Sequence, residues 1–273
     1  MKITVVTTLY NRPAHLRLML AALAGQTRRP DEVVVADDGS DDATADALRA
    51  LAAASPIPCT VVRQEKDGYR LAAARNLAIR AATGDYLVFA DCDIALLPDA
   101  VAAHAALAAP GRILCGNRAL LGEEATARLF AADPAPSPAD WEAAWRDADA
   151  TELRTAQALF LRNAALRRWH LARPHKPKVI GCHFSLFLDD VRRVNGFDEN
   201  FVGWGYEDDD FARRLYKAGV RPASAILAAR ALHLWHPSLA PQRLQRHRDR
   251  PNRAYFRRWR VPAFCANGLV KRP

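Results

Sequence analysis

The 273-residue sequence lacks the features of secreted, disulfide-bonded and membrane-spanning proteins. Its five cysteines are scattered without C-x-x-C spacing, and an odd number argues against a disulfide framework or a zinc knuckle. The N-terminal apolar run is too short for a signal peptide, and no later run reaches the length of a membrane span. There is no internal repeat. We therefore expect a globular cytoplasmic protein, and the 50% hydrophobic content can fill one large α/β domain or two small ones.

Acidic charge is also in short supply. Lys and Arg number 39 against 30 Asp and Glu, which gives a net charge of +9 and favours anionic partners. Much of the excess lies in residues 243–260, where Tyr255, Phe256 and Trp259 stand among the arginines. This tail could dock on an anionic membrane face, making the protein peripheral at the inner side of a membrane. A solvated helix or a mobile arm is the alternative.

Short β-branched runs alternate with helical patterns over the first hundred residues. Such runs, apolar throughout, predict a mostly parallel central sheet flanked by helices, which is an α/β fold. From about residue 118 this rhythm is lost, and a later Gly-rich loop precedes a helix that should start near Glu207. The predicted strands are 2–10, 31–40, 59–64 and 85–93, and the predicted helices between them are 14–27, 42–53 and 71–83.

Acidic residues follow two of these strands. The carboxyl ends of parallel strands meet at one edge, so the ends near Thr8, Asp38 and Asp91 should converge on one crevice. Asp91 and Asp93 point to the same side in extended backbone and could share a divalent cation that carries a diphosphate, with Cys92 turned into the core. Asp38 could accept hydrogen bonds from a ribose or a base. Turn formation or helix capping, for example by Asp38 or Ser40, is the alternative for such acids.

A second acidic group begins the late helix. Residues 207–210 read Glu-Asp-Asp-Asp, and the helix dipole alone would stabilise acids there, which would account for Asp209 and Asp210. The dipole does not explain the preceding Gly203-Trp204-Gly205 loop. A tryptophan between glycines offers an apolar face on which a sugar ring can stack, and the glycines let the sugar approach the backbone.

Four segments in order resemble the nucleotide-binding half of glycosyltransferase family 2. Members of that family have the GT-A fold, a Rossmann-like single domain, and use nucleotide-diphosphate sugars. The resemblance implies that Asp93 binds the metal and that Asp91 binds the ribose or the metal's water shell, with Asp91 itself a possible metal ligand. The segments are "VVTTLYNRPAHL", "QTRRPDEVVVADDGSDD", "GYRLAAARNLAI" and "DYLVFADCD". The residues implied in donor nucleotide binding are Thr8, Tyr10, Arg12, Asp38, Arg70 and Asp91.

The segment "NGFDENFVGWGYEDDDFARRL" resembles the acceptor segment of bacterial chondroitin-polymerase domains and β-1,4-galactosyltransferases. The resemblance implies that Asp208 is the general base and that Glu207 hydrogen-bonds the acceptor, beside Trp204 and Gly205. It also implies a histidine as the last metal ligand. In "ALHLWHPS" His236 is our choice and His233 the weaker candidate, and the ion would be Mn²⁺ or Mg²⁺.

Two positions depart from the pattern. Tyr206 stands where relatives carry the second glycine of G-W-G-G, and His183 in "GCHFS" stands where many have asparagine. Because both departures fall in the acceptor half, we expect Tyr206 and His183 to contribute to acceptor binding and to alter acceptor choice.

These observations predict an inverting, divalent-metal-dependent glycosyltransferase. It would move a sugar from a nucleotide-diphosphate sugar, UDP-linked in our interpretation, to a hydroxyl of a glycan, glycolipid or small-molecule acceptor. We divide the chain into a donor half, an acceptor and catalytic half of the same domain, and a basic C-terminal arm, at residues 1–117, 118–238 and 239–273.

Two alternatives stay open. A nucleotide- or nucleic-acid-binding protein without transferase activity should spread basic and aromatic residues over a groove, whereas here acids gather at strand ends, so no nucleic-acid partner is expected. A nucleotidyltransferase should have a Gly-rich phosphate loop after the first strand, which "TTLYNRP" does not supply.

Overall fold

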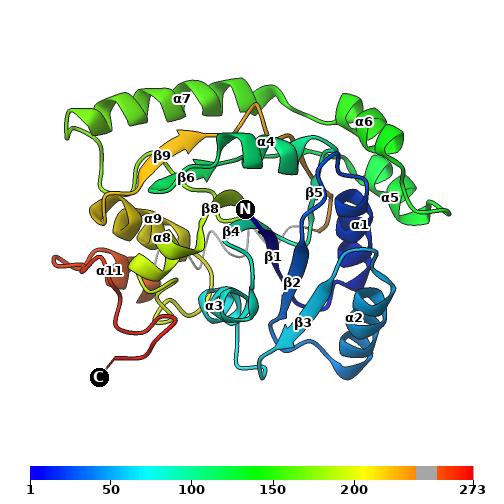
Figure 1. Cartoon of the computed structure of the whole chain (residues 1–273), viewed down its shortest axis with the longest axis horizontal. Helices are drawn as coiled ribbons and strands as arrows, with labels where there is room; N and C mark the ends of the chain where they lie inside the picture. The colour runs from blue at the N-terminus through cyan, green and yellow to red at the C-terminus, as the bar shows by residue number, and fades with distance from the viewer. Residues whose placement is uncertain (238–250, 273) are drawn as a thin grey trace.

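The structure is a computed structural model that describes residues 1–237 and 251–272 (Figure 1). Its element order confirms the alternation of strands and helices over the first hundred residues. The strands are β1 (Ile3–Leu9), β2 (Glu32–Asp37), β3 (Cys59–Arg63), β4 (Tyr86–Ala90), β5 (Ile94–Leu96), β6 (Arg112–Cys115), β7 (Ala119–Leu120), β8 (His183–Phe187), β9 (Arg221–Ser224) and β10 (Ala231–His233). The helices are α1 (Pro13–Ala24), α2 (Asp42–Ala54), α3 (Leu71–Ala81), α4 (Ala100–Leu107), α5 (Glu123–Ala131), α6 (Pro138–Asp147), α7 (Thr151–Arg168), α8 (Leu188–Arg193), α9 (Glu207–Lys217) and α11 (Pro251–Phe256).

A seven-stranded sheet forms the centre, in the order β3-β2-β1-β4-β8-β6-β9. Only β8 runs against its neighbours, and every other adjacent pair is parallel, as the apolar runs predict. A smaller sheet, β5-β10-β7, lies beyond the end of β4. Because β10 pairs with β5, which follows β4 almost directly, the late segment around His233 returns to the acidic end of β4.

Helices cover both faces of the large sheet (Figure 1). α3 and α9 lie along one face, while α1, α2 and α4 lie along the other. Successive side chains of β1 enter different halves of the core: Val5 packs on the α2 side and Val6 on the α3 side. This double coverage explains why the strands read as continuous apolar runs rather than as alternating ones.

The loops after β1 and β2 are tied together. Ser40 Oγ accepts a hydrogen bond from the Asn11 amide and donates one to the buried Asp37 carboxylate. Asp41, rather than Ser40, caps α2 by accepting from the Thr44 amide. The register places Leu9 opposite Asp37, so the side chains that follow both strands meet at one edge.

The described part of the C-terminal region is packed against the body of the protein. Lys217 donates a hydrogen bond to the Val261 carbonyl, and Asn195 donates to the carbonyls of Cys265 and Val270. Residues 251–272 therefore do not form the free arm that their composition suggested, whereas the expectation for residues 243–250 lies outside the described residues. Across 1–237 and 251–272, no helix has both the length and the apolar character needed to cross a membrane.

Candidate active site

The expected crevice begins at the ends of β1 and β2. Asp38 is buried, and its carboxylate accepts hydrogen bonds from the Gln64 side chain at 2.5 Å and from the Arg70 amide at 3.3 Å. Tyr10 is exposed, with the Lys66 ammonium 3.4 Å from the centre of its ring. Half-buried Thr8 lies on the same edge. The guanidinium of Arg70 binds the Glu65 carbonyl and faces Asp67, so it is Arg70's backbone that contacts Asp38.

The two acids after β4 have different partners. Asp91 pairs with Arg75 of α3 at 3.2 Å, whereas Asp93 faces Arg12 at 3.0 Å. Cys92 between them is buried in the core, which confirms its predicted orientation. The divergence of Asp91 and Asp93 means that they do not act as one symmetrical pair.

His233 and His236 both lie close to Asp93. Its carboxylate lies 3.2 Å from Nε2 of His236 and 3.9 Å from Nε2 of His233. One ligand atom from each of the three residues falls within 4.8 Å of the others. The Leu234 amide donates to the Asp93 carbonyl and holds the two segments together. His233, the weaker candidate by sequence, thus lies in the same group, although His236 is nearer to Asp93.

The charges around Asp93 favour its ionised form. Burial acts against ionisation, but the hydrogen bond from His236 and the nearby His233 and Arg12 outweigh it and lower the pKa of Asp93. His15 of α1 lies beside this group, with its ring edge-on to that of His236 at 6.2 Å. Burial, reinforced by the charge of Arg12, lowers the pKa of His15 to about 4, so His15 is neutral.

Arg75 links the acids after β4 to the acids at the start of α9. Its buried guanidinium lies 3.2 Å from Asp91 and 3.6 Å from Glu207, and it donates to the Gly181 carbonyl. Burial, together with the charge of Asp208, raises the pKa of Glu207 to about 7 in spite of Arg75. The sequence reasoning gave Arg75 no role. The available signal was a charged residue among the apolar positions of α3, since a buried charge needs partners.

The four acids at the start of α9 divide their roles. Asp208 is half-buried, and its carboxylate accepts from the Gly181 amide at 3.3 Å and from the Asp209 amide at 2.7 Å. Glu207 faces Arg75. Asp210 is fully buried and pairs at 2.6 Å with Arg214 of the same helix. Arg214 also donates to the Val194 and Gly196 carbonyls, which fixes α9 to the preceding segment. The helix dipole is therefore not the whole reason for this cluster.

The loop before α9 is held at several points. The Gly203 amide donates to the Tyr69 carbonyl at 2.8 Å, and the Asn252 side chain donates to the Gly205 carbonyl at 3.1 Å. Trp204 is 36% exposed. Tyr206 has a left-handed backbone with φ of 74°, which explains why glycine suits this position in relatives, and its ring stacks on Phe256. The contribution of Asn252 and Phe256 could not be recognised from their sequence neighbourhood.

His183 is not brought to this crevice. It is fully buried on β8, with Nδ1 hydrogen-bonded to the Asn117 carbonyl at 2.7 Å and Nε2 to Nε2 of His104 at 2.8 Å. Burial lowers its pKa to about 4. Both ring nitrogens are in use, so His183 has no atom left for an acceptor, and the structure replaces that expectation with a role inside the core.

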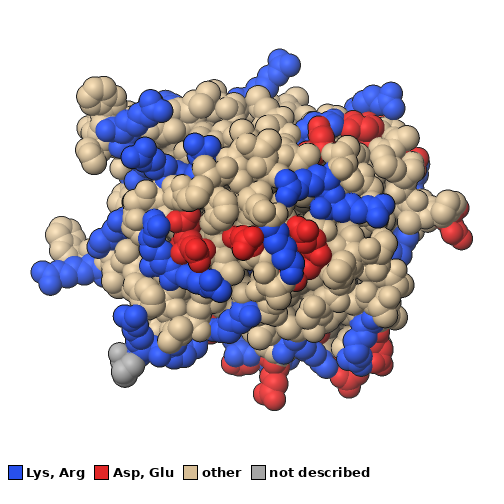
Figure 2. Space-filling model, in the orientation of Figure 1, with Lys and Arg blue, Asp and Glu red and all other residues tan. Residues whose placement is uncertain are grey.

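Charge is mixed on the surface. On the face seen in Figure 2, Lys and Arg side chains are scattered widely and Asp and Glu gather in groups among them near the middle. The basic excess therefore does not form a continuous groove on that face, as the nucleic-acid-binding alternative would require there.

A mostly parallel sheet flanked by helices, with acids at its carboxyl edge and a second acidic group at the start of α9, fits the GT-A class of glycosyltransferases. The chain belongs to the family described as "Glycosyl transferase family 2", whose profile matches residues 4–141. A second profile, described as "N-terminal domain of galactosyltransferase", matches residues 162–237. This glycosyltransferase assignment decides against the two alternatives left open by the sequence.

Relatives support the assignment. Validoxylamine A glucosyltransferase of Streptomyces hygroscopicus subsp. limoneus is 34% identical over 233 residues, which are 80% of this chain and 48% of that protein. Chondroitin synthase of Escherichia coli is 29% identical over 229 residues, covering 80% of this chain and 32% of that protein. The chain thus spans about half or less of the length of these curated relatives.

Solved structures support the fold. Mannosyltransferase PcManGT from Pyrobaculum calidifontis, in complex with GDP-Man and Mn²⁺, superposes with a TM-score of 0.60 at 23% identity, over 90% of this chain and 60% of that one. S. aureus TarS in complex with UDP-GlcNAc gives a TM-score of 0.58 at 17% identity, over 87% of this chain and 60% of that one. At these identities the likeness confirms the GT-A fold alone.

Proposed function

We propose that this glycosyltransferase moves a sugar from a UDP-linked donor to a hydroxyl of a glycan, glycolipid or small-molecule acceptor, with inversion at the anomeric carbon and with Asp208 as general base. One observation carries the proposal. The guanidinium of Arg75 contacts both Asp91 and Glu207. Asp91 is close in sequence to Asp93 on the donor side, and Glu207 is next to Asp208 on the acceptor side. A donor and an acceptor bound on the two sides would therefore meet near Arg75.

The donor nucleotide would occupy the edge formed by Thr8, Tyr10 and Asp38. The Asp38 carboxylate, already oriented by Gln64 and the Arg70 amide, suits a base N–H or a ribose hydroxyl. Arg12 lies next to Asp93 and would neutralise diphosphate oxygens. Asp91 is paired with Arg75. This pairing favours a role for Asp91 in binding the ribose or the metal's water shell over direct ligation of the metal.

The donor set of Asp93, His233 and His236 fits a divalent ion. Two of the three ligands are imidazoles, which suit Mn²⁺ better than Mg²⁺, because Mg²⁺ prefers oxygen ligands alone. Among the described residues, His15 Nε2 is a buried nitrogen without a hydrogen-bond partner beside this group, which supports a polar ligand there. When bound, the ion would neutralise charge on the departing nucleoside diphosphate.

Asp208 would take the proton of the acceptor hydroxyl. As that oxygen bonds to the anomeric carbon, the bond from this carbon to the phosphate oxygen breaks and its electron pair leaves with the nucleoside diphosphate. The amides of Gly181 and Asp209 fix the orientation of the Asp208 carboxylate beforehand. Glu207 would hydrogen-bond the acceptor sugar, while Trp204, Gly205 and Tyr206 would pack against it.

The test measures nucleotide release from UDP- and GDP-sugars, with a mixed acceptor panel and with or without MnCl₂. We expect turnover with a UDP-sugar that EDTA abolishes and that Mn²⁺ restores better than Mg²⁺. Asp93→Ala and Asp208→Ala should each abolish transfer, whereas the exposed Asp46→Ala on α2 serves as matched control. Unchanged turnover in either site variant would overturn the assignment of that residue.

Membrane docking of the tail stays a prediction within this proposal. Trp259 is 95% exposed beside Arg257 and Arg258, a combination that favours an anionic lipid surface. Because residues 251–272 pack on the body, the sharper test is Trp259→Ala rather than truncation. Co-sedimentation with phosphatidylserine vesicles should weaken in this variant, and equal binding of variant and parent would remove the prediction.

A further inference from the structure

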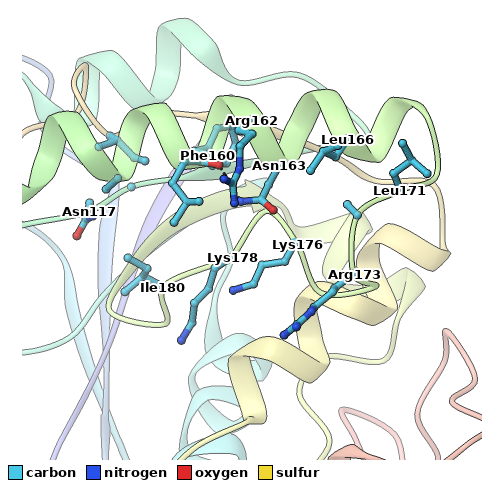
Figure 3. Close-up of a pocket in the computed structure, with 15 residues that line it drawn as sticks. Asn117, Phe160, Arg162, Asn163, Leu166, Leu171, Arg173, Lys176, Lys178 and Ile180 are labelled. Carbon is cyan, nitrogen blue, oxygen red and sulfur yellow. Dashed lines mark hydrogen bonds between the residues drawn. The ribbon is translucent and has the colours of Figure 1, made fainter.

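A second cavity adjoins the acceptor side. It has a volume of about 500 Å³ and lies between α7 and the chain segment that leads into β8 (Figure 3). Its α7 wall is partly apolar, with Phe160 and Leu166, and Ile180 contributes to the opposite wall. Apolar walls of this kind suit the face of a sugar ring or a small aglycone.

Cations surround the same cavity. Arg162 comes from α7, and Arg173, Lys176 and Lys178 come from the opposite segment. Figure 3 shows the side chains of Arg173, Lys176 and Lys178 extending from that segment side by side. The arrangement places four positive charges around one small cavity, three of them within six residues of sequence.

Most of these charges have no acidic partner. Within 1–237 and 251–272, no carboxylate lies within 4.0 Å of Arg162, Arg173 or Lys176, and Lys178 reaches Asp209 only at 4.0 Å. Burial lowers the pKa of Lys176; the charges of Asp209 and Asp208 act against this effect, and the like charges of Lys178 and Arg173 reinforce it. A cluster of like charges is destabilising unless something compensates it, so its presence beside a cavity points to an anionic ligand.

The cavity lies near the candidate base. Lys178 is only three residues before Gly181, whose amide binds the Asp208 carboxylate. Three residues of extended chain span at most about 11 Å. Burial acts to lower the pKa of Lys178, but the charges of Asp208, Asp209 and Glu207 outweigh it and raise that pKa. A ligand held by the cations would therefore extend to within reach of Asp208.

We propose that this cavity selects an acceptor that carries an anionic group, a carboxylate or a phosphate, near the hydroxyl to be glycosylated. The inference rests on the proposed function and specifies its acceptor class. An anionic group would be repelled by the acids at the start of α9 and attracted by Arg173 and Lys176. This opposition of charge would orient the acceptor, with its anion among the cations and its hydroxyl toward Asp208.

The test compares matched probes by ligand-observed NMR titration of the full chain at 50 mM salt. The carboxylate pair is 4-nitrophenyl β-D-glucuronide and 4-nitrophenyl β-D-glucoside, and the phosphate pair is glucose 6-phosphate and glucose. UDP and Mg²⁺ are present at saturation, so that the donor's own phosphate sites are filled; Mg²⁺ replaces Mn²⁺ here because it is diamagnetic and does not broaden the probe signals. At least one acidic probe should bind about tenfold more tightly than its neutral partner, and the successful pair identifies the anion.

Variants locate the preference. In Arg173→Ala/Lys176→Ala the ratio of acidic to neutral affinity should fall to near one, and Arg162→Ala should lower it partially. Arg154→Ala, an exposed arginine of α7 outside the cavity, should keep the parent ratio. A thermal melt of each variant checks folding, and Lys176→Gln provides a milder change if the double variant is damaged.

Two results would overturn the proposal: neither acidic probe binds more tightly than its neutral partner, or the preference survives in the double variant. Failure of the proposed function would look different. In that case either no nucleotide-sugar would be turned over, or turnover would be the same in Asp208→Ala as in the parent. Neither result depends on the ratio of probe affinities.

Discussion

The donor side and the acceptor side of the crevice are built differently. On the donor side, Asp38 follows β2, and Asp91 and Asp93 follow β4. Because β1 pairs with both strands, the register of the sheet sets the spacing of these acids. On the acceptor side, Trp204 stands on a loop that is attached through single hydrogen bonds at Gly203 and Gly205.

The difference has a physical consequence. Moving a donor residue means shifting a buried strand, which costs many contacts, whereas moving the acceptor loop breaks the hydrogen bonds at Gly203 and Gly205 and the stacking of Tyr206 on Phe256. The donor side is thus suited to a constant nucleotide and the acceptor side to a variable partner. Arg75 is the point where the two sides meet, because it contacts both Asp91 and Glu207.

Asp208→Asn should give the largest difference between the effect on kcat and the effect on UDP affinity. The amide cannot accept the acceptor proton, so kcat should fall about 10²- to 10⁴-fold. The affinity for UDP, measured by calorimetry, should change less than about twofold, because Asp38 and Asp93 are untouched. Asp189→Asn, an exposed acid of α8, is the control. Loss of UDP affinity equal to the loss of kcat would show that the sides are not separable.

Arg75→Met should damage both sides at once. It leaves Asp91 and Glu207 without their shared cation, and removing one partner of a buried ion pair costs about 3 kcal/mol. For a chain of this size the melting temperature should fall by roughly 5–10 °C in a calorimetric scan. Arg49→Met, which breaks only an exposed pair on α2, should shift it very little. Equal shifts in the two variants would contradict the importance of the junction.

The pH dependence of stability should report Glu207. The folded protein keeps the Glu207 proton to a pH of about 7, above the ordinary value of 4.5, so this group favours folding at low pH. Its contribution should be lost as the pH rises from about 4.5 through about 7, at a cost on the order of 3 kcal/mol. Burial also raises the pKa values of Asp91 and Asp209 to about 6, so these two groups add to the same decline. Chemical denaturation of the metal-free protein at several pH values should show the decline, and Glu207→Gln should make it smaller. A decline of the same size in the variant would assign the effect to another group.

Asn252→Ala should have the smallest effect and touch only the acceptor side. It removes one hydrogen bond to the Gly205 carbonyl, worth about 1 kcal/mol, so the KM for acceptor should rise about fivefold. The KM for donor should stay constant. Asn267→Ala removes a hydrogen bond to Asn200 in the same segment and is the matched control. A parallel rise in both KM values would mean that the loop also supports the donor.

The same contrast explains what could be predicted from the sequence. The first four strands, their parallel direction and the position of Asp38 and of the acids after β4 at the carboxyl ends of strands follow from local patterns. Apolar runs and the residues at strand ends can be recognised almost independently of the rest of the chain. The pairing of His236 with Asp93 was also expected, because the family resemblance supplied the order of the motifs.

Long-range contacts were not predictable in the same way. The burial of His183 depends on His104 of α4, and the role of Arg75 depends on Glu207 far along the chain. Neither partner is marked by a local pattern. The packing of residues 251–272 on the body of the protein was not predictable either. An Arg-rich composition is compatible both with a solvated arm and with a segment fixed by a few buried side chains, such as Asn252 and Cys265.

The hydrogen bond from Asn252 to Gly205 has a practical meaning for protein engineering. A designer who wishes to change acceptor choice would naturally exchange the loop around Trp204 between related enzymes. Asn252 hydrogen-bonds the loop, and Phe256 stacks on its Tyr206. An exchanged loop would therefore lose these contacts unless residues 251–272 are exchanged with it. The smallest exchangeable unit is therefore two segments distant in sequence and joined in space.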